Sequence, residues 1–486
     1  MAVIAPSSRP NHTTASSAFL SFVQLIVWPL LLVTAALTYA DPDLWGHVRF
    51  GQDILATGTL PRVDPYSFTQ DRPWVNHEWL SEVVMAFCYG LGGAVGLVGL
   101  KILVVGLALL LIFRHLSSSV PPLFSAAGLA IVVWGAFPLT TTVRPQLWTF
   151  LGLAVLMSTL VRNPRPWWLP FIFAVWSNLH GGWIVGIGVL WLWTIGELYE
   201  NRRLSSITLA VVATGATLLN PHGWGLWQFI AETVRLGRQG ITEWQPLWVA
   251  PPSEWVVWLI TVALTVWVKP RRLATWLIVF MLGAASAKVN RLGPLFVEVS
   301  VMVLAADRAW AIPTIASRVR TARGPAIINA IAVGIITVAA SVRSLPHLTC
   351  LPIESQWAAD PGVAQALKGR QGRLAVEFNW GEYAIWHLGP QIRVSIDGRR
   401  ETVYSETTLA TQRSLALGRP QGLEWLSVTT PEYLWFDASR VDLKKAAESH
   451  GYRVDSDTAH SFLAVRRDLP VVVLRPPADF KRVCFP

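Results

Sequence analysis

Charged residues are scarce in this 486-residue chain: they make up only 14% of it, whereas 52% of the residues are hydrophobic and 26 are tryptophan. Soluble globular proteins carry about 25% charged residues, so a water-surrounded protein of this length would lack polar surface. Cysteine is scarcer still, with three residues, which excludes a disulfide scaffold. The chain also lacks a Walker loop, a glycine-rich dinucleotide fingerprint, CxxC and HExxH, and this argues against ATP-driven transport.

Long apolar windows are present instead, and they recur from residue 18 to residue 341. A helix of about 20 apolar residues crosses the hydrocarbon core of a bilayer. The sequence therefore predicts a polytopic α-helical membrane protein with about eleven spans. The predicted spans are residues 18–40, 94–113, 121–139, 145–161, 166–179, 181–196, 204–220, 252–268, 273–287, 293–306 and 324–341.

The basic residues indicate the orientation of the spans. The formal net charge is +10, but no basic run is interleaved with stacking aromatics, so nucleic acid is not expected as a partner. If the N-terminus is cytoplasmic, the short inner connections hold more Arg and Lys than the longer outer ones, as cytoplasmic loops do. The C-terminus then lies outside the cytoplasm.

The composition changes after residue 341, and residues 345–486 contain no apolar run of spanning length. Short β-type runs at 373–378, 392–396, 433–436, 462–465 and 471–474 alternate with helix-like stretches at 361–369, 405–417 and 440–450. This pattern favours an extracytoplasmic α/β domain at 345–486, after a transmembrane domain at 1–344. Cys350 and Cys484 flank it on the oxidising side, where they form either a disulfide or two free thiols.

The first outer loop, residues 41–93, is rich in polar side chains and too long for a plain connector. Residues 44–56 and 77–90 have the spacing of amphipathic helices that could lie at the membrane surface. Charged groups beside spans are costly and tend to mark function. The candidates here are Asp41, Asp43, His47, Arg49, His77 and Glu78. The alternative is that the acids lie in a solvated turn and that His77 and Glu78 begin a surface helix.

Later outer helix ends add further polar groups on the same predicted side of the membrane. They are Arg144, Asn178, His180, His222, Glu243, Lys288 and Arg291. With the first loop, they predict an outer cavity lined by acids, histidines and arginines. The alternatives are that the arginines anchor helices at the interface and that Asn178, His180 and His222 bond to backbone at helix ends.

Several sequence strings resemble the C-type membrane glycosyltransferases, which include the protein O-mannosyltransferases, the lipid A aminoarabinose transferases and the oligosaccharyltransferases. The longest is DPDLWGHVRFGQDILATGTLPRVDPYSFTQDRPWVNHEWL, and the others are VRPQLWTF, WSNLHGGW, LNPHGW, and FNWGEYAIW followed by SIDGRRE. The predicted architecture is similar as well. The resemblance is to a bacterial branch of that superfamily, and it implies a location in the bacterial inner (plasma) membrane.

The resemblance implies inverting transfer of a sugar from a polyprenyl-phosphate donor to an extracytoplasmic glycan, lipid or protein acceptor. It makes Asp41 or Asp43 the base for the acceptor proton, or a ligand of a divalent cation such as Mg or Mn. Arg144, Lys288 and Arg291 would contact the leaving phosphate. His77 and Glu78 join the catalytic group, and the remaining candidates, His47, Arg49, Asn178, His180, His222 and Glu243, are assigned to substrate binding. Many members carry His-Pro-Asp-Glu or Asp-Glu where this chain has Asp-Pro-Asp, so the acting carboxylate and the need for metal stay open.

Two other classes of function remain open. A transporter or flippase of a lipid-linked or anionic solute should show mid-membrane ionisable groups and internal repeats, and the sequence shows neither clearly. The other class is a structural membrane protein whose α/β domain binds a partner. In that domain, residues 379–383 and 397–400 follow predicted strand ends, where they form either turns or an acceptor-binding surface.

Overall fold

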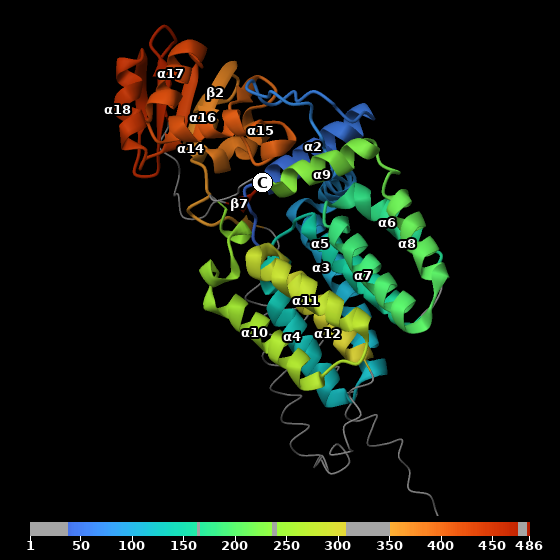
Figure 1. Ribbon diagram of the computed structural model, residues 1–486. Coiled ribbons are helices and arrows are strands. Elements are labelled where there is room, and N and C mark those ends of the chain that lie inside the picture. The colour runs from blue at the N-terminus through green and yellow to red at the C-terminus, as the bar shows by residue number, and fades with distance from the viewer. Residues whose placement is uncertain (1–36, 163–165, 236–240, 308–349, 475–483) are drawn as a thin grey trace, which may run out of the picture.

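The computed structural model describes residues 37–162, 166–235, 241–307, 350–474 and 484–486. The described chain forms a bundle of helices and, toward its C-terminal end, a sheet flanked by helices (Figure 1). The predicted span at 324–341, the predicted domain boundary at 344 and nearly all of the predicted span at 18–40 lie outside the described residues.

Each predicted span between residues 94 and 306 coincides with a helix of the bundle. These helices are α3 (Trp79–Ser119), α4 (Pro122–Thr140), α5 (Gln146–Arg162), α6 (Leu169–Leu179), α7 (Trp183–Asn201), α8 (Leu204–Ala216), α10 (Pro252–Val268), α11 (Leu273–Lys288) and α12 (Gly293–Ala306). A further helix, α9 (Trp224–Arg235), and the short 3-10 helices η1 (Thr242–Trp244), η2 (Leu247–Val249) and η3 (Asn290–Leu292) connect them.

The described helices do not establish the predicted number of spans. Two of them, α3 and residues Leu123–Thr140 of α4, are long and apolar enough to cross a membrane, and five further apolar helices, α5, α6, α8, α10 and α11, have only 10–17 residues. The short helices end where polar and glycine residues interrupt the apolar run. Helix α6, for example, stops after 11 residues because His180 adopts an extended conformation before Gly181 and Gly182.

The segment predicted as the first outer loop is folded, with helix α2 (Leu44–Thr57) packed against α3. The two helices are so close that a Cβ on Gly51 would lie 2.0 Å from the carbonyl oxygen of Glu82. Helix α3 bends at Gly92 and at Gly93, which has a φ of +57°. The bend separates its amphipathic first segment from the apolar helix that follows. The apolar face of α2 is buried against protein instead of facing a membrane surface, because Trp45 packs edge-on against Tyr383 and Phe485.

The five-stranded sheet has the order β3-β2-β4-β6-β5. Its strands are β2 (Gly372–Val376), β3 (Ile392–Val394), β4 (Tyr433–Asp437), β5 (Tyr452–Asp457) and β6 (Ser461–Arg466). Strand β2 runs parallel to β3 and β4, and the β4–β6 and β6–β5 pairs are antiparallel.

Alternating residues bury the two faces of this sheet in separate cores. Leu374 and Val376 pack with residues of α14 (Pro361–Leu367) and α15 (Gly381–Leu388). Ala375 points to the other face, which is covered by α16 (Glu406–Ala416), α17 (Pro420–Thr429) and α18 (Val441–Ser449). The first core also includes residues of α2, so the sheet and the first loop share one hydrophobic core.

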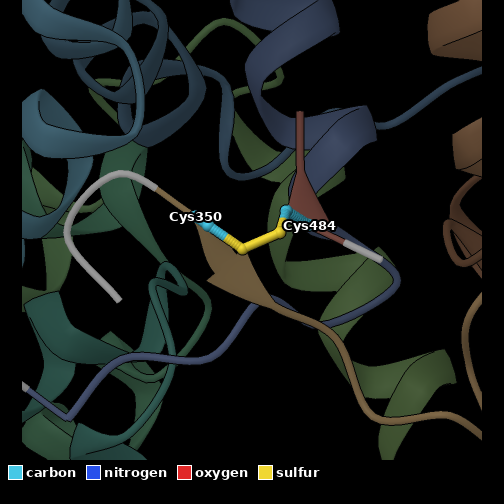
Figure 2. The surroundings of a disulfide bond; sticks show 2 residues. All are labelled: Cys350 and Cys484. Atoms are coloured by element: carbon cyan, nitrogen blue, oxygen red, sulfur yellow. A yellow bond between two sulfur atoms is a disulfide. The ribbon is translucent and has the colours of Figure 1, made fainter. Parts of the chain in front are cut away.

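A second, two-stranded sheet ties the chain together next to α2. Strand β1 (Leu351–Pro352) pairs with β7 (Cys484–Phe485), and a disulfide joins Cys350 to Cys484 with a Cα–Cα distance of 5.1 Å (Figure 2). The amide of Ala40 donates a hydrogen bond to the Pro352 carbonyl at 2.9 Å. This small sheet therefore holds the residue that precedes Asp41.

Candidate functional site

Asp41 and Asp43 lie at the junction between an extended segment and the start of α2. The backbone before them is fixed on both sides, because Tyr39 bonds to the Thr141 carbonyl and Ala40 to the Pro352 carbonyl, both at 2.9 Å. Asp41 is only 1% exposed. Asp43 occupies the N-cap position of α2 but makes no side-chain cap bond, and its side chain is 37% exposed.

Arg144, between α4 and α5, connects both acids to later helix ends. Its guanidinium pairs with Asp41, lies 3.6 Å from the Asp43 Oδ2 atom, and donates to Glu243 Oε1 at 3.0 Å. The other Glu243 oxygen lies 3.3 Å from Arg291 Nη1. We call these five side chains the arginine bridge. The bridge joins the first loop, the α4–α5 connection, η1 and η3.

The surroundings of Asp43 change its acidity. Burial of the carboxyl among the site residues raises the pKa of Asp43 to about 6; His47 and Arg291 oppose this rise, and Glu243 and Glu78 add to it. The carboxyl is thus ionised at neutral pH but close to its titration range, which suits a group that accepts a proton.

A second group, which we call the histidine cluster, comprises His47, His77, Glu78 and His180. Glu78 Oε1 lies 3.5 Å from both His77 Nε2 and His180 Nε2. Burial alone would raise the pKa of Glu78, but His77 and His180 lower it overall, so the carboxylate is the stable form.

The protonation state of His180 follows from its partners. Burial lowers the pKa of His180 to about 3, so the ring is neutral. Its Nδ1 atom accepts a hydrogen bond from the Gly182 amide at 3.1 Å and lies 2.6 Å from Thr149 Oγ1. Because a backbone amide can only donate, the ring proton sits on Nε2, which faces Glu78.

His47 and His222 are both linked to Glu82, His47 directly and His222 through Asn76. Burial opposes protonation of His47, but Glu82, whose Oε1 atom lies 3.6 Å from Nδ1, and Glu78 raise its pKa overall. The Nε2 atom of His222 lies 3.1 Å from the Asn76 carbonyl oxygen, and the Asn76 amide donates to Glu82 at 2.6 Å. Glu82 is a site residue that the sequence analysis missed, since it lies within a helix-spaced segment.

Three predicted residues lie apart from these groups. Arg49 pairs with Asp53 at 3.0 Å, four residues along α2. Lys288 is exposed at the end of α11 and joins neither the arginine bridge nor the histidine cluster. Asn178 makes helix-end bonds to the carbonyls of Ala174 and Leu219, and accepts from Trp79 Nε1 at 2.9 Å, as the alternative reading of this residue expected.

Residues 361–466, which form the five-stranded sheet and its flanking helices and which we call the sheet domain, contribute a carboxyl group to the same region. Glu382, in the first turn of α15, is 4% exposed and accepts a hydrogen bond from the Gly46 amide of α2 at 3.0 Å. Nearby, Arg399 binds Asp64 at 2.7 Å and Asp397 at 2.7 Å, and lies over the rings of Phe50, Tyr66 and Trp74. The string around Glu382 therefore lies at the seam between the first loop and the sheet domain.

No protein-family model matches the chain, and no curated protein matches it in sequence. Solved structures do match. The oligosaccharyltransferase of Archaeoglobus fulgidus, tethered with an acceptor peptide containing the NVT sequon, aligns with a TM-score of 0.56 and 9% identity over 93% of this chain and 74% of that one. ArnT from Cupriavidus metallidurans, bound to undecaprenyl phosphate, aligns with a TM-score of 0.53 and 12% identity over 95% and 99%.

A further structure of the Archaeoglobus fulgidus enzyme, AglB, in complex with an inhibitory peptide and a dolichol-phosphate, aligns with a TM-score of 0.53 and 11% identity over 93% and 75% of the two chains. The chain has the C-type glycosyltransferase fold. At these identities the likeness is one of fold, and it extends over both the bundle and the sheet domain.

The divalent cation implied by the C-type resemblance has no matching set of ligands in the described part of the chain. No three His, Cys, Asp or Glu side chains among those residues are grouped as a metal ion would require. The Asp41 carboxylate is already paired with Arg144. The residues present do not fit a bound cation, and the proposals below use no step through one.

Proposed function

We propose that the protein is a membrane glycosyltransferase that moves a sugar from a polyprenyl-phosphate donor to an extracytoplasmic acceptor. The observation that carries this proposal is the arginine bridge, in which Arg144 contacts Asp41, Asp43 and Glu243 while Arg291 holds the far side of Glu243. It puts a base and two cations in one cluster. The C-type fold supports it, because its neighbours include a structure with undecaprenyl phosphate and one with dolichol-phosphate.

Asp43 is the proposed base. Its side chain is 37% exposed, whereas Asp41 is 1% exposed and paired with Arg144. In the proposed step, the acceptor's nucleophilic atom attacks the anomeric carbon and its proton passes to Asp43. The bond from that carbon to the phosphate oxygen breaks, and its electron pair leaves with the phosphate. Attack opposite the leaving group inverts the anomeric centre.

Arg144 and Arg291 are the proposed phosphate contacts, because charge grows on the leaving oxygen as the glycosidic bond breaks. Glu243 bridges the two guanidiniums, with one carboxylate oxygen toward each. A phosphate is likewise an anion with several acceptor oxygens. We infer that donor phosphate takes the place of the Glu243 carboxylate between the two arginines.

The proposed location is the bacterial inner membrane, with a cytoplasmic N-terminus and an extracytoplasmic sheet domain. The disulfide between Cys350 and Cys484 supports this orientation, since disulfides persist in oxidising compartments. A topology reporter fused after the C-terminal residue should be active outside the cytoplasm. Activity only in the cytoplasm would contradict the proposed side.

A transfer assay tests the function directly. The purified full-length protein in lipid is incubated with undecaprenyl-phosphate-linked hexoses and pentoses carrying a radiolabel, together with glycan, lipid and peptide acceptors. We expect transfer from one donor class, inversion at the anomeric carbon, and loss of transfer in Asp43→Asn. Glu424→Gln, which changes an exposed carboxylate on α17, is the matched control. Absence of transfer from every donor, combined with solute flux in vesicles, would favour a transporter instead.

A further inference from the structure

The sheet domain places a buried carboxyl group against the proposed base, and the sugar-transfer scheme does not use it. We propose that Glu382 is a positioning residue that stays protonated while Asp43 is ionised, so that the two carboxyl groups hold one proton between them across the seam. This inference deepens the proposed function, and rests on it only for the role of Asp43 as base.

Gly46 and Gly398 define the space that the two carboxyl groups share. A Cβ on Gly398 would lie 2.3 Å from Asp43 Oδ1 and 2.9 Å from Glu382 Oε1. The second Glu382 oxygen, Oε2, accepts from the Gly46 amide at 3.0 Å, and a Cβ on Gly46 would lie 2.1 Å from it. One oxygen of Glu382 is therefore occupied as an acceptor, and the other is the one that borders Asp43.

The cations that border Glu382 are engaged with other acids. Arg399 donates from its backbone amide, Nε and Nη2 to Asp397, and from Nη1 and Nη2 to Asp64. Arg144 contacts Asp41, Asp43 and Glu243. In the described part of the chain no ion pair joins Glu382 to a basic side chain.

An isolated ionised carboxylate in such a place would be costly. Removing an ion from water costs more free energy in real proteins than the N-terminal turn of a helix returns to an anion. Burial and the nearby negative charges of Asp43 and Asp397 raise the pKa of Glu382 well above its usual range. Protonation removes the cost without removing the hydrogen bond from Gly46.

The charged groups around the pair come from every element packed against it. Asp43 faces His47 of α2, Glu78 of the first loop, Arg144, Glu243 of η1 and Arg291 of η3. Glu382 faces Asp43 of the first loop and Glu82 of α3, and within the sheet domain it faces Asp397 and Arg399. Two ionised carboxylates side by side would add negative charge where the donor phosphate must bind. A neutral Glu382 avoids this repulsion. Because Glu382 lies in the sheet domain, the charge of Asp43 then depends on whether that domain is docked against the first loop.

Infrared spectroscopy tests the pair without any donor. A protonated carboxyl group absorbs at a higher carbonyl frequency than a carboxylate, so the full-length protein in lipid is titrated with pH and the protonated band followed. The wild type minus Glu382→Gln difference should contain this band at neutral pH. The bands of other buried carboxyl groups, such as that of Glu298, are common to both proteins and cancel in the difference spectrum. Glu424→Gln, on the exposed surface of α17, should show no such difference at neutral pH.

Asp43→Asn provides the decisive second measurement. Removing the neighbouring negative charge should make Glu382 easier to ionise, so its band should disappear at a pH lower by about one unit or more, as for strongly interacting sites. An unchanged midpoint in Asp43→Asn, or a wild type minus Glu382→Gln difference without a protonated band, would overturn the proposal. A protein that transfers no sugar but shows both changes would retain the carboxyl pair and lose only the proposed function.

Discussion

At the scale of single residues, the structure distinguishes the two acids that the sequence could not separate. Asp41 is enclosed and paired with Arg144, and Asp43 is the partly exposed acid with a pKa of about 6. Below that pH Asp43 carries a proton and cannot accept another. Transfer should therefore rise with pH to a plateau above about 6, and Asp43→Asn should lower the rate by about 10²–10⁴-fold.

The pH dependence of kcat/KM for transfer measures this prediction. Asp41→Asn is the informative comparison, because it removes the buried partner that orients Arg144 and so should weaken donor binding while leaving the acid limb near pH 6. If the acid limb disappears in Asp41→Asn and persists in Asp43→Asn, the assignment of the base is wrong.

Glu243 provides a second prediction at this scale. Glu243→Gln keeps the size of the side chain but removes the charge that occupies Arg144 and Arg291. We expect tighter binding of undecaprenyl phosphate to the purified protein, since both guanidiniums become available to its phosphate. The control is Glu232→Gln on α9, which removes an exposed carboxylate that pairs with Arg72. It should leave the binding of undecaprenyl phosphate unchanged. Weaker binding in Glu243→Gln would show that the carboxylate supports the donor site instead of competing with it.

Site residues could be predicted from the sequence where a charged side chain also lay in a loop on the predicted outer side of the spans. Arg144 and the first-loop acids lie on the same predicted side of the spans, and the structure brings them together. Lys288 satisfied the same criterion but projects from the end of α11, since helix phase decides direction. The contact of Glu382 with Gly46 spans 336 residues, and a contact that depends on docking of the sheet domain leaves no local signal in the sequence.

At the scale of elements, the tight turn between α6 and α7 determines where His180 points. Gly182 has a φ of −66°, so its backbone accepts any residue, but a Cβ there would lie 2.1 Å from Thr149 Oγ1. Gly182→Ala should displace Thr149, turn His180 away from Glu78, and cost about 1–3 kcal/mol of stability through overpacking.

Gly188→Ala is the matched control, because it lies inside α7 with no atom within 4 Å of the added Cβ. It should stabilise the helix by up to about 1 kcal/mol. Thermal unfolding of both variants, with transfer activity, checks the prediction. Equal stability of the two variants would contradict the proposed clash.

Helices and strands were predicted correctly where they bury one apolar side. They were missed where their own hydrophobic pattern is weak and contacts with the rest of the protein hold them in place. Strands β2 and β4 and helices α2 and α16 coincide with predicted segments to within one or two residues. The polar edge strand β5 has no apolar run, and helix α15 has only a short one at residues 383–386, and neither element was predicted. The predicted strand at 471–474 is irregular, because it has no ladder partner in the described sheets.

At the scale of the whole molecule, the site depends on the contact between the first loop and the sheet domain. Helix α2 lies between the bundle and the sheet domain in Figure 1, with α15 packed directly on it. The β1–β7 sheet, closed by the disulfide, holds Ala40, and Glu382 holds Gly46. Both ends of the Asp41–Asp43 segment are therefore fixed by the C-terminal part of the chain, so domain docking and activity should be lost together.

Arg399 tests this coupling, since its ion pair with Asp64 crosses the seam. Its guanidinium joins Asp64 of the first loop to Asp397 of the sheet domain within a box of Phe50, Tyr66 and Trp74. Arg399→Gln leaves two buried carboxylates without their cation, which should cost about 3–5 kcal/mol. Neither acid forms an ion pair with the arginine bridge among the described residues, but Asp397 and Arg399 lie beside Glu382, so we expect any loss of transfer to act through the position of α2 and the charge around Glu382.

Limited proteolysis and thermal unfolding should show earlier cleavage and melting of Arg399→Gln, and its transfer rate should fall at temperatures where the bundle remains folded. Arg393→Gln, on the exposed side of β3, should change stability by no more than about 0.5 kcal/mol, as surface substitutions do. If Arg399→Gln destabilises the sheet domain while transfer stays at the wild-type rate, the site does not require the seam, and Asp43 must be held in place by the bundle alone.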